Sequence, residues 1–514
     1  MLKSELFNNW RGINRISDRL NMPPDFLYDL LNGYVKKDVK SNLGVMQQRD
    51  GSAKFNSVAL NTASVAYGAN ANIRTVFEAK WDGSSTDVII RAGTAWGKYN
   101  GTDSFDTIDV ARTDEAMGQC AMFKNELIMV DGGIPRKMVA AGTISALSAD
   151  ANMPQDSDAV WVHGDKVWLN STSAPMIAYF CKTNSASGAT SWTGSTDAGT
   201  IDLRTVLPKG DRIRGFRSYG GSSSQLIAII CQNYTVIYQA GANVYTFTIM
   251  QIFPTTCLSV SACDYVGTDL VYPSRNSLTS IYSSVKNEEL EVASLSKYVE
   301  LLYRNLVASV TDTTQISGVF NHKLNHYYIT FPVANNFQTL VYSVDIGNIV
   351  GRWTYPFSIY SWCERQSGAV LAGSNLYVYT INTSTDDDGT AISFNAAFPA
   401  LYFKSADRYK KPVEFEALLQ ATANLTLLLD YWYGIATLVS DKVTKSISIS
   451  SSSSLWDVAL WDVSYWDMQG NIIYRTSDLL GRGRMLFLEI RNNTSGSLIT
   501  IPWLKIGYVL EGNN

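Results

Sequence analysis

Histidines, cysteine clusters and long apolar runs are scarce or missing in this 514-residue chain. It has three histidines, none beside a serine or cysteine nucleophile pattern, so histidine-based catalysis is not expected. The six cysteines are scattered without the spacing of a metal site, which favours buried, reduced thiols. No apolar run approaches the length that spans a bilayer, and the first residues lack the apolar stretch of a signal peptide. We therefore expect no membrane anchor and folding in the cytosol.

The chain also lacks a strong excess of charge of either sign. Forty-two Lys and Arg residues against 46 Asp and Glu residues give a net charge of −4 at pH 7. Global attraction to nucleic acid is not expected, although a mildly acidic surface lets DNA slide past without sticking. The hydrophobic fraction of 46% is ample for large cores and excludes a disordered chain.

Strands of alternating apolar and polar residues run through most of the chain. Clear examples lie at 244–249, 376–381 and 425–430. Alternation with period two places one face of a strand in a core and the other outward. Between the strands stand dipeptides that supply the positive φ angles of tight hairpin turns: Asp82-Gly83, Asn100-Gly101, Asp131-Gly132, Gly164-Asp165 and Asp388-Gly389. The sequence therefore predicts a large all-β protein.

The hairpins repeat from about residue 55 to 400 with a loose period near fifty residues. Repeated meanders in this number favour radial blades around a channel, so residues 51–400 are predicted to form a β-propeller-like domain. Five to seven blades fit the span, and six is the number we expect. Two consecutive β-sandwiches are the alternative. The expected hairpins are 87–99, 121–139, 159–170, 226–239, 244–252, 266–282, 318–331, 339–353 and 368–381.

The two ends of the chain differ from this repeated region. Residues 1–50 are predicted to form an N-terminal arm with one short helix, which begins at Pro23-Pro24 and ends at Gly33. Residues 401–514 are predicted to form a C-terminal β-sandwich with strands at 413–420, 424–432, 443–450, 472–476, 485–491 and 498–509. A second helix is expected at 294–306, with Ser294 or Ser296 as its cap.

Motifs that could carry chemistry have simpler explanations. The spacing of His322 and His326 aligns two imidazoles only on a helix, and strand patterns flank them, so a hairpin loop is expected. The segment Asp386–Gly389 lacks the ligand alternation of a calcium loop and is expected to be a solvated turn. The stretch 185–192 has glycine, threonine and tryptophan like a sialidase aspartate box, but it lacks the aspartate. We predict no catalytic, cofactor-binding or metal-binding residues, and no cofactor.

The most unusual local pattern is a five-residue repeat of Trp-Asp at Trp456, Trp461 and Trp466. An odd spacing flips consecutive residues across a strand, so one flat strand cannot align the three indoles. Aromatic anchors rimmed by charge are typical of subunit contacts. We therefore name these tryptophans, with Phe26 and Leu30 of the expected N-terminal helix, as interface candidates. A tryptophan-lined sandwich core is the alternative for the repeat.

Several short stretches resemble the propeller-type tail proteins of short-tailed bacteriophages. They are Trp10–Asn14, Leu20–Pro24, Leu30–Tyr34 and Gln48–Gly51 near the N-terminus, Gly210–Gly215 and Val266–Leu270 inside the chain, and the Trp-Asp repeat with Gly481–Arg484 near its end. Each stretch is short, but together they reach from end to end of the chain.

This resemblance implies a non-enzymatic tail hub, nozzle or DNA-stabilising protein. In that family six copies form a ring or tube around the channel through which the genome leaves. Expected partners are copies of the chain itself, a portal or adaptor protein above, a tail fibre, needle or tip protein, and genomic DNA transiently in the lumen. The protein would be made in the host cytoplasm and reside in the tail of the virion. A receptor-binding or glycan-processing propeller is the competing interpretation, and a cellular propeller scaffold is a third.

Overall fold

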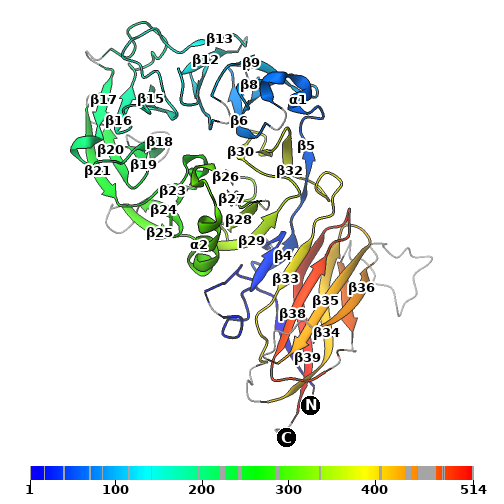
Figure 1. Ribbon diagram of the computed structural model, residues 1–514. Helices are drawn as coiled ribbons and strands as arrows, with labels where there is room; N and C mark the ends of the chain where they lie inside the picture. Colours follow the sequence, from blue (N-terminus) through cyan, green and yellow to red (C-terminus); the bar gives the residue numbers. More distant parts are fainter. Residues whose placement is uncertain are drawn as a thin grey trace.

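Two β-rich bodies make up the protein. The computed structural model describes residues 2–511 apart from 17, 39–40, 69–70, 84, 114–115, 141, 194–196, 220–225, 241–245, 284–289, 335–336, 404–407, 435–441, 450–470, 477–478 and 480. These described residues form a ring of four-stranded sheets, a β-propeller, with a β-sandwich beside it (Figure 1). The predicted all-β class and propeller architecture are confirmed.

The propeller has seven antiparallel blades within the described residues. They are, in order, β6 (Ile73–Lys80), β7 (Thr86–Ala92), β8 (Ala95–Tyr99) and β9 (Phe105–Asp109); β10 (Gln119–Phe123), β11 (Glu126–Val130), β12 (Arg136–Val139) and β13 (Ile144–Ala146); β14 (Val160–His163), β15 (Lys166–Asn170), β16 (Ile177–Phe180) and β17 (Gly199–Asp202); β18 (Ile213–Tyr219), β19 (Leu226–Cys231), β20 (Thr235–Ala240) and β21 (Phe247–Phe253); β22 (Asp264–Val266), β23 (Asp269–Pro273), β24 (Leu278–Ser283) and β25 (Leu290–Ser294); β26 (Ser317–Asn321), β27 (His326–Phe331), β28 (Gln338–Ser343) and β29 (Asn348–Thr354); and β30 (Ser361–Glu364), β31 (Val370–Gly373), β32 (Val378–Ser384) and β5 (Gly51–Lys54).

The seventh blade closes the ring with a strand from the other end of the domain. Its outermost strand, β5, precedes the first blade in sequence and pairs antiparallel with β32, Thr380 opposite Ala53. Its inner strand, β30, contacts β26 of the sixth blade and β6 of the first. The expected number of six blades is therefore wrong. A strand that is far from its hairpin partners in sequence leaves no local hairpin signal.

The sandwich consists of two facing sheets. One contains β1 (Leu2–Phe7), β3 (Gly33–Lys37), β4 (Gly44–Gln48), β39 (Ile499–Leu510), β34 (Lys410–Ala421) and β37 (Asn471–Thr476); the other contains β2 (Asp29–Leu31), β33 (Phe394–Ala397), β38 (Leu486–Asn492), β35 (Leu425–Tyr433) and β36 (Val443–Ile449). Alternate residues of β34 and β35, such as Leu419 and Leu427, are buried in the same core. All six strands predicted beyond residue 400 are present.

One sheet continues from the propeller into the sandwich. The sixth blade is extended through β2 to β33, β38, β35 and β36, which gives nine strands. β2 pairs in parallel with β29 at Leu31 and Arg352, and antiparallel with β33 on its other side. A single hydrophobic core therefore runs from the sixth blade into the sandwich, and it includes Leu30 and Trp353. We call this junction the seam.

The predicted N-terminal arm and its helix are wrong. Residues 29–31 are strand β2, and β1, β3 and β4 of the first fifty residues belong to the sandwich. Leu27 and Leu30 have no exposed surface, because they fill the core of the seam rather than one face of a helix. Apolar residues three positions apart are typical of a helix. Here they belong to a segment that lies between β29 and β33 and is buried in the shared core.

The second predicted helix exists but begins later. Helix α2 spans Glu300–Ser309, because Leu290–Ser294 form the outer strand of the fifth blade. Ser296 does not cap it, since its hydroxyl accepts a hydrogen bond from the Leu278 amide instead. The other helical turns are α1 (Leu60–Ala63) and the 3₁₀ turns η1 (Val65–Tyr67), η2 (Leu203–Thr205), η3 (Val260–Ala262), η4 (Lys297–Val299) and η5 (Thr313–Gln315).

Candidate functional site

The interface candidates divide into two groups. Phe26 is 4% exposed and lies 5.1 Å, ring to ring, from Tyr298, while Leu30 is fully buried. Both side chains therefore pack against their own chain, and only Phe26 keeps a small exposed surface. Trp456, Trp461 and Trp466 lie outside the described residues.

The first stretch of the phage-tail resemblance lies against the sixth blade. The Ile13 amide donates a hydrogen bond to the Ile349 carbonyl at 2.9 Å, and the Asn348 side chain donates to the Arg11 carbonyl at 2.9 Å. Gly12 adopts φ +96°, and a Cβ there would lie 2.5 Å from the Ile349 carbonyl oxygen. Only glycine fits this close approach without strain.

The next stretch crosses the seam at Asn32 and Gly33. Asn32 has φ +52°, and its side chain accepts from the Thr354 amide at 2.7 Å and donates to the Ser393 carbonyl at 2.9 Å. The Trp353 indole donates to the Gly33 carbonyl at 2.9 Å. These contacts join the blade strand β29 to the segment just before β33.

The Gln48–Gly51 stretch places a buried cation at the same junction. The Arg49 guanidinium is 1% exposed and forms a two-pronged ion pair with Asp387, one contact being 2.9 Å. Arg49 also donates to the Thr354 carbonyl at 2.8 Å, and its guanidinium lies 4.1 Å from the Tyr355 ring centroid. The segment Asp386–Gly389 is a turn, as expected, but Asp387 within it is deeply buried, so the expectation of a solvated turn is wrong at that residue.

The His322 and His326 pair lies on a hairpin, as predicted. His326 begins β27 and is buried against Tyr34, 5.2 Å ring to ring, whereas the His322 side chain is 72% exposed and bonded to Glu364. Among the described residues, no group of three or more His, Cys, Asp or Glu side chains could hold a metal ion.

His326 makes the seam sensitive to acid. Burial lowers the pKa of His326 to about 4, against about 6.5 in an unfolded chain. As the pH falls, the unfolded state binds the proton first, so folded-state stability is lost between about pH 6.5 and pH 4. Between pH 7 and pH 5, protonation of His326 alone is expected to lower the free energy of unfolding by roughly 1–2 kcal/mol. Urea unfolding at the two pH values should show that His326→Gln reduces the loss by this amount; an equal loss in both proteins would contradict the assignment.

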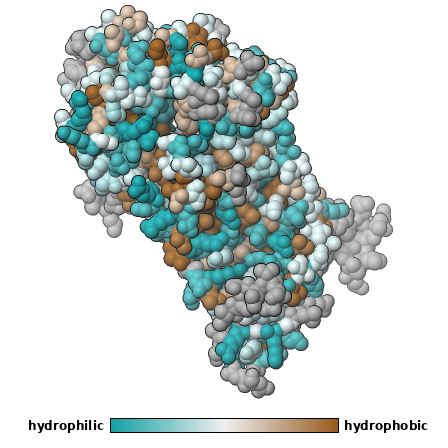
Figure 2. Space-filling model, viewed as in Figure 1, coloured by the Kyte–Doolittle hydropathy of each residue, from teal (hydrophilic) through white to brown (hydrophobic). Residues whose placement is uncertain are grey.

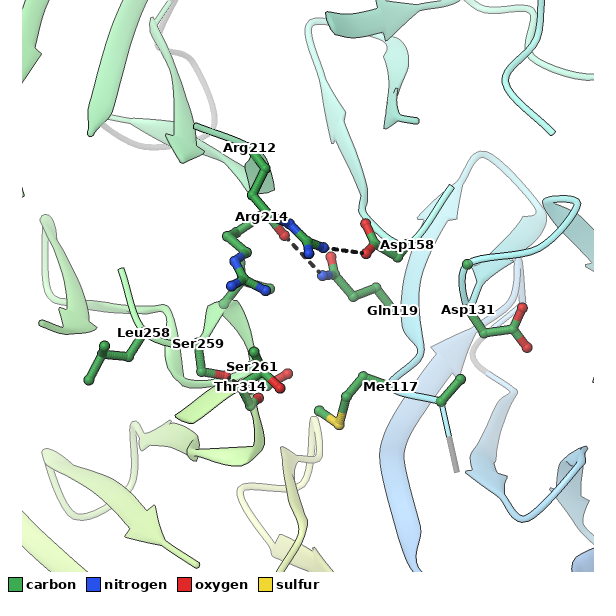
Figure 3. Close-up of a pocket in the computed structure, with 13 residues that line it drawn as sticks. Met117, Gln119, Asp131, Asp158, Arg212, Arg214, Leu258, Ser259, Ser261 and Thr314 are labelled. Atoms are coloured by element: carbon green, nitrogen blue, oxygen red, sulfur yellow. Dashed lines mark hydrogen bonds and ion pairs between the residues drawn. The ribbon is translucent and has the colours of Figure 1, made fainter. Parts of the chain in front are cut away.

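A cavity opens at one end of the propeller channel (Figure 3). Each blade begins at its inner strand, so the segments that enter β10, β14, β18, β22 and β26 gather at the same end of the channel. They enclose about 330 Å³, lined by Gln119, Asp158, Arg212, Arg214 and Ser261 among others. A second cavity of about 180 Å³ shares Gln119 and Ser261 with it, so the two are adjacent along the channel. The volume of the first cavity, about 330 Å³, is at the small end of the range for ligand pockets.

The acidic groups of the channel cavity already have cationic partners. Arg212 pairs with Asp158 at 3.2 Å, as Figure 3 shows. Asp131 binds both Arg91 and Arg112, and although burial opposes the effect, these two arginines hold its pKa below the usual range. Arg214 projects into the cavity, where burial first and Arg212 second lower its pKa.

Sequence reasoning missed these arginines. Arg212 and Arg214 stood within one of the phage-like stretches, but they were not identified as a site. Two arginines separated by one residue at the start of an inner strand are the signal that was available. The residues that face Arg212 and Arg214 across the cavity come from blades far apart in the sequence, so local sequence could not predict them.

Within the part of the chain that the structure describes, no helix has the length and apolar character needed to cross a membrane. Figure 2 shows one face of the molecule, on which hydrophobic residues are scattered among hydrophilic ones.

Comparisons with known proteins return structural similarity only. No family model matches the chain, and no curated protein matches it. Among solved structures, the WD40 domain of Pan2 from Neurospora crassa aligns with a TM-score of 0.38 and 11% identity, over 65% of this chain and 96% of that one. Virginiamycin B lyase from Staphylococcus aureus aligns with a TM-score of 0.41 and 8% identity, over 63% of this chain and 98% of that one. The β-propeller assignment rests on the blades of this chain itself, and neither neighbour's activity is transferred to it.

Proposed function

We propose that the protein is a non-enzymatic structural subunit of a short-tailed phage tail, a hub or nozzle. Six copies would close into a ring or tube around the DNA-exit channel, between a portal or adaptor protein above and a fibre, needle or tip protein below. The ring would retain the genome and then let it pass. The protein would be made in the host cytoplasm and act in the virion.

The observation that carries this proposal is the seam. Three of the four N-terminal stretches that give the phage resemblance, those around Gly12, Asn32 and Arg49, hold the propeller against the sandwich through backbone and buried side-chain contacts. A nine-stranded sheet and one continuous core join the two bodies, and we expect them to move as one block. Rigid blocks suit heterologous contacts that must close into a ring, because a small angular error at each interface accumulates around the ring.

The path for DNA lies between subunits in this proposal. The cavity in the propeller channel encloses about 330 Å³. A cavity of that volume holds a small molecule. It cannot hold a DNA duplex, whose major groove alone is about 12 Å wide. The net charge of −4 is compatible with a lumen that does not hold DNA tightly.

The experiment removes the proposed anchors and follows assembly. The triple variant Trp456→Ala, Trp461→Ala, Trp466→Ala is expected to abolish rings in negative-stain micrographs, since aromatic anchors dominate such interfaces. The matched control, Ile16→Ala, Leu301→Ala, Val344→Ala, removes three exposed apolar side chains of the described surface and should leave rings intact. Rings that survive the tryptophan variant would contradict the role of the repeat, and single particles from the unaltered chain with its tail neighbours would contradict the proposal itself.

Deleting the N-terminus is not a usable test. Residues 2–37 supply β1, β2 and β3, so their loss removes strands from both sheets of the sandwich. Point variants keep the fold and separate assembly from stability.

A receptor-binding or glycan-processing propeller is the second candidate, supported by the cavity at the channel end. It would require binding to a glycan array, or glycan hydrolysis, by the isolated chain. Ring formation without either activity would favour the tail subunit.

A further inference from the structure

We propose that the cavity at the channel end binds a small molecule through a carboxylate or phosphate group, with Arg214 as the main contact. This inference is independent of the tail proposal, because it concerns the propeller's own channel and not the space between subunits. It rests on the unsatisfied donors of Arg214, on the charge balance of the wall, and on the size of the cavity.

Arg214 has spare hydrogen-bonding capacity. A guanidinium carries five N–H donors. The described residues supply one acceptor, the Gln232 side-chain oxygen, at a long 3.4 Å, and Nε of Arg214 is buried with no partner among them. By contrast, the buried guanidinium groups of Arg49 and Arg91 are well supplied, since each has a carboxylate and several carbonyl oxygens.

The wall around Arg214 has a positive charge that no described carboxylate neutralises by direct contact. Asp158 is taken by Arg212, and Asp131 is shared between two arginines outside the cavity. In the adjacent cavity, the Arg217 guanidinium donates only to backbone carbonyl oxygens among the described residues. This balance counts only the described lining residues, from Ala116 to Thr314.

An unpaired cation in a partly desolvated site is costly, and an oxyanion is the chemical group that removes that cost. Burial and the neighbouring Arg212 both disfavour the charged form of Arg214 and lower its pKa. A carboxylate or phosphate would accept two parallel hydrogen bonds from the guanidinium, the strongest arrangement available to arginine. The amide of Gln119 and the hydroxyl of Ser261 line the same space and offer neutral donors.

The size of the cavity limits the ligand. About 330 Å³, with the 180 Å³ neighbour, accommodates a compact molecule and excludes a polymer. Leu258, Val260 and Met117 give part of the wall an apolar character. The ligand is therefore a small polar molecule with at least one anionic group and a short organic body, or the inorganic anion itself.

The test is a titration of thermal stability with inorganic phosphate and, separately, citrate, at constant ionic strength. Ligand that binds only the folded state raises Tm in a saturable way. The full chain should show saturation with at least one of the two anions, and which of them acts distinguishes phosphate from carboxylate chemistry. Arg214→Gln is expected to raise the half-saturating concentration at least tenfold. Arg304→Gln, an exposed arginine on α2, should leave it within twofold.

A second variant covers the case in which Arg214→Gln does not fold. Ser261→Leu keeps every charge and fills the cavity, and it should also raise the half-saturating concentration at least tenfold. Circular dichroism without added anion checks that each variant is folded. A Tm that does not saturate with either anion, or that rises equally in the Arg214→Gln, Ser261→Leu and unaltered proteins, would overturn the site. Rings that form while phosphate and citrate have no effect would overturn this inference and leave the tail proposal standing.

Discussion

Asp387→Asn is expected to lower the free energy of unfolding by about 3 kcal/mol, because it leaves the Arg49 guanidinium buried without its counter-charge. Both side chains are at most 3% exposed, and Asp387 also accepts a hydrogen bond from Ser52 at 2.8 Å. Urea unfolding at pH 7 measures the change. We expect the seam to be destabilised as well, since Arg49 links the segment between β4 and β5 to Thr354 at the end of β29.

The neighbouring residue provides the control. Asp388 pairs with Lys54 at 2.9 Å, but the two side chains are 38% and 36% exposed. Asp388→Asn is expected to cost less than about 1 kcal/mol, because water screens an exposed pair and asparagine tolerates the positive φ of this position. Equal effects of the two substitutions would mean that burial of the Arg49 pair does not matter.

Gly12→Ala is expected to destabilise the protein by about 3 kcal/mol, because it combines a positive φ with a backbone clash. The added Cβ would lie 2.5 Å from the Ile349 carbonyl oxygen, and neither segment can retreat without losing the Ile13–Ile349 hydrogen bond. The same urea series measures this change.

Gly101→Ala is the matched comparison for Gly12→Ala. Gly101 also has a positive φ, +85°, but a Cβ there meets nothing within 4 Å. Its substitution is expected to cost about 1 kcal/mol, the conformational part alone. If Gly12→Ala cost no more than Gly101→Ala, the close packing of the N-terminal segment on the sixth blade would be contradicted.

Local alternation predicted the strands well. Leu425–Tyr433 was expected at 424–432 and Leu486–Asn492 at 485–491, because each has one face in the sandwich core and the other toward solvent. The turn at Asn100-Gly101, which joins β8 to β9, could also be predicted from local sequence. The positive φ of Gly101 and the two strands that the turn connects all lie within one short stretch of the chain.

Long-range pairings could not be predicted in this way. β5 completes a blade whose other strands lie more than 300 residues later, and β2 joins a blade to a sandwich with only three residues. Leu27 and Leu30 have helical spacing, yet their burial comes from elements that meet only in the folded chain. The partner of Asp387 and the surroundings of Arg214 depend on the same kind of distant contact.

These pairings connect the fold to the proposed role. If β2, Arg49 and Gly12 lock the propeller to the sandwich, each subunit presents its contact surfaces at a fixed angle, and a ring can close. A hinge at the same place would give an adaptable particle instead.

Hydrogen exchange across the seam tests this rigidity most directly. Amides of β2 and β33 should exchange as slowly as those of β27 in the core of the sixth blade, because all three belong to one sheet. Exchange of β2 and β33 within seconds, while β27 and the sandwich strand β38 stay protected, would show two bodies joined by a hinge and would contradict the account.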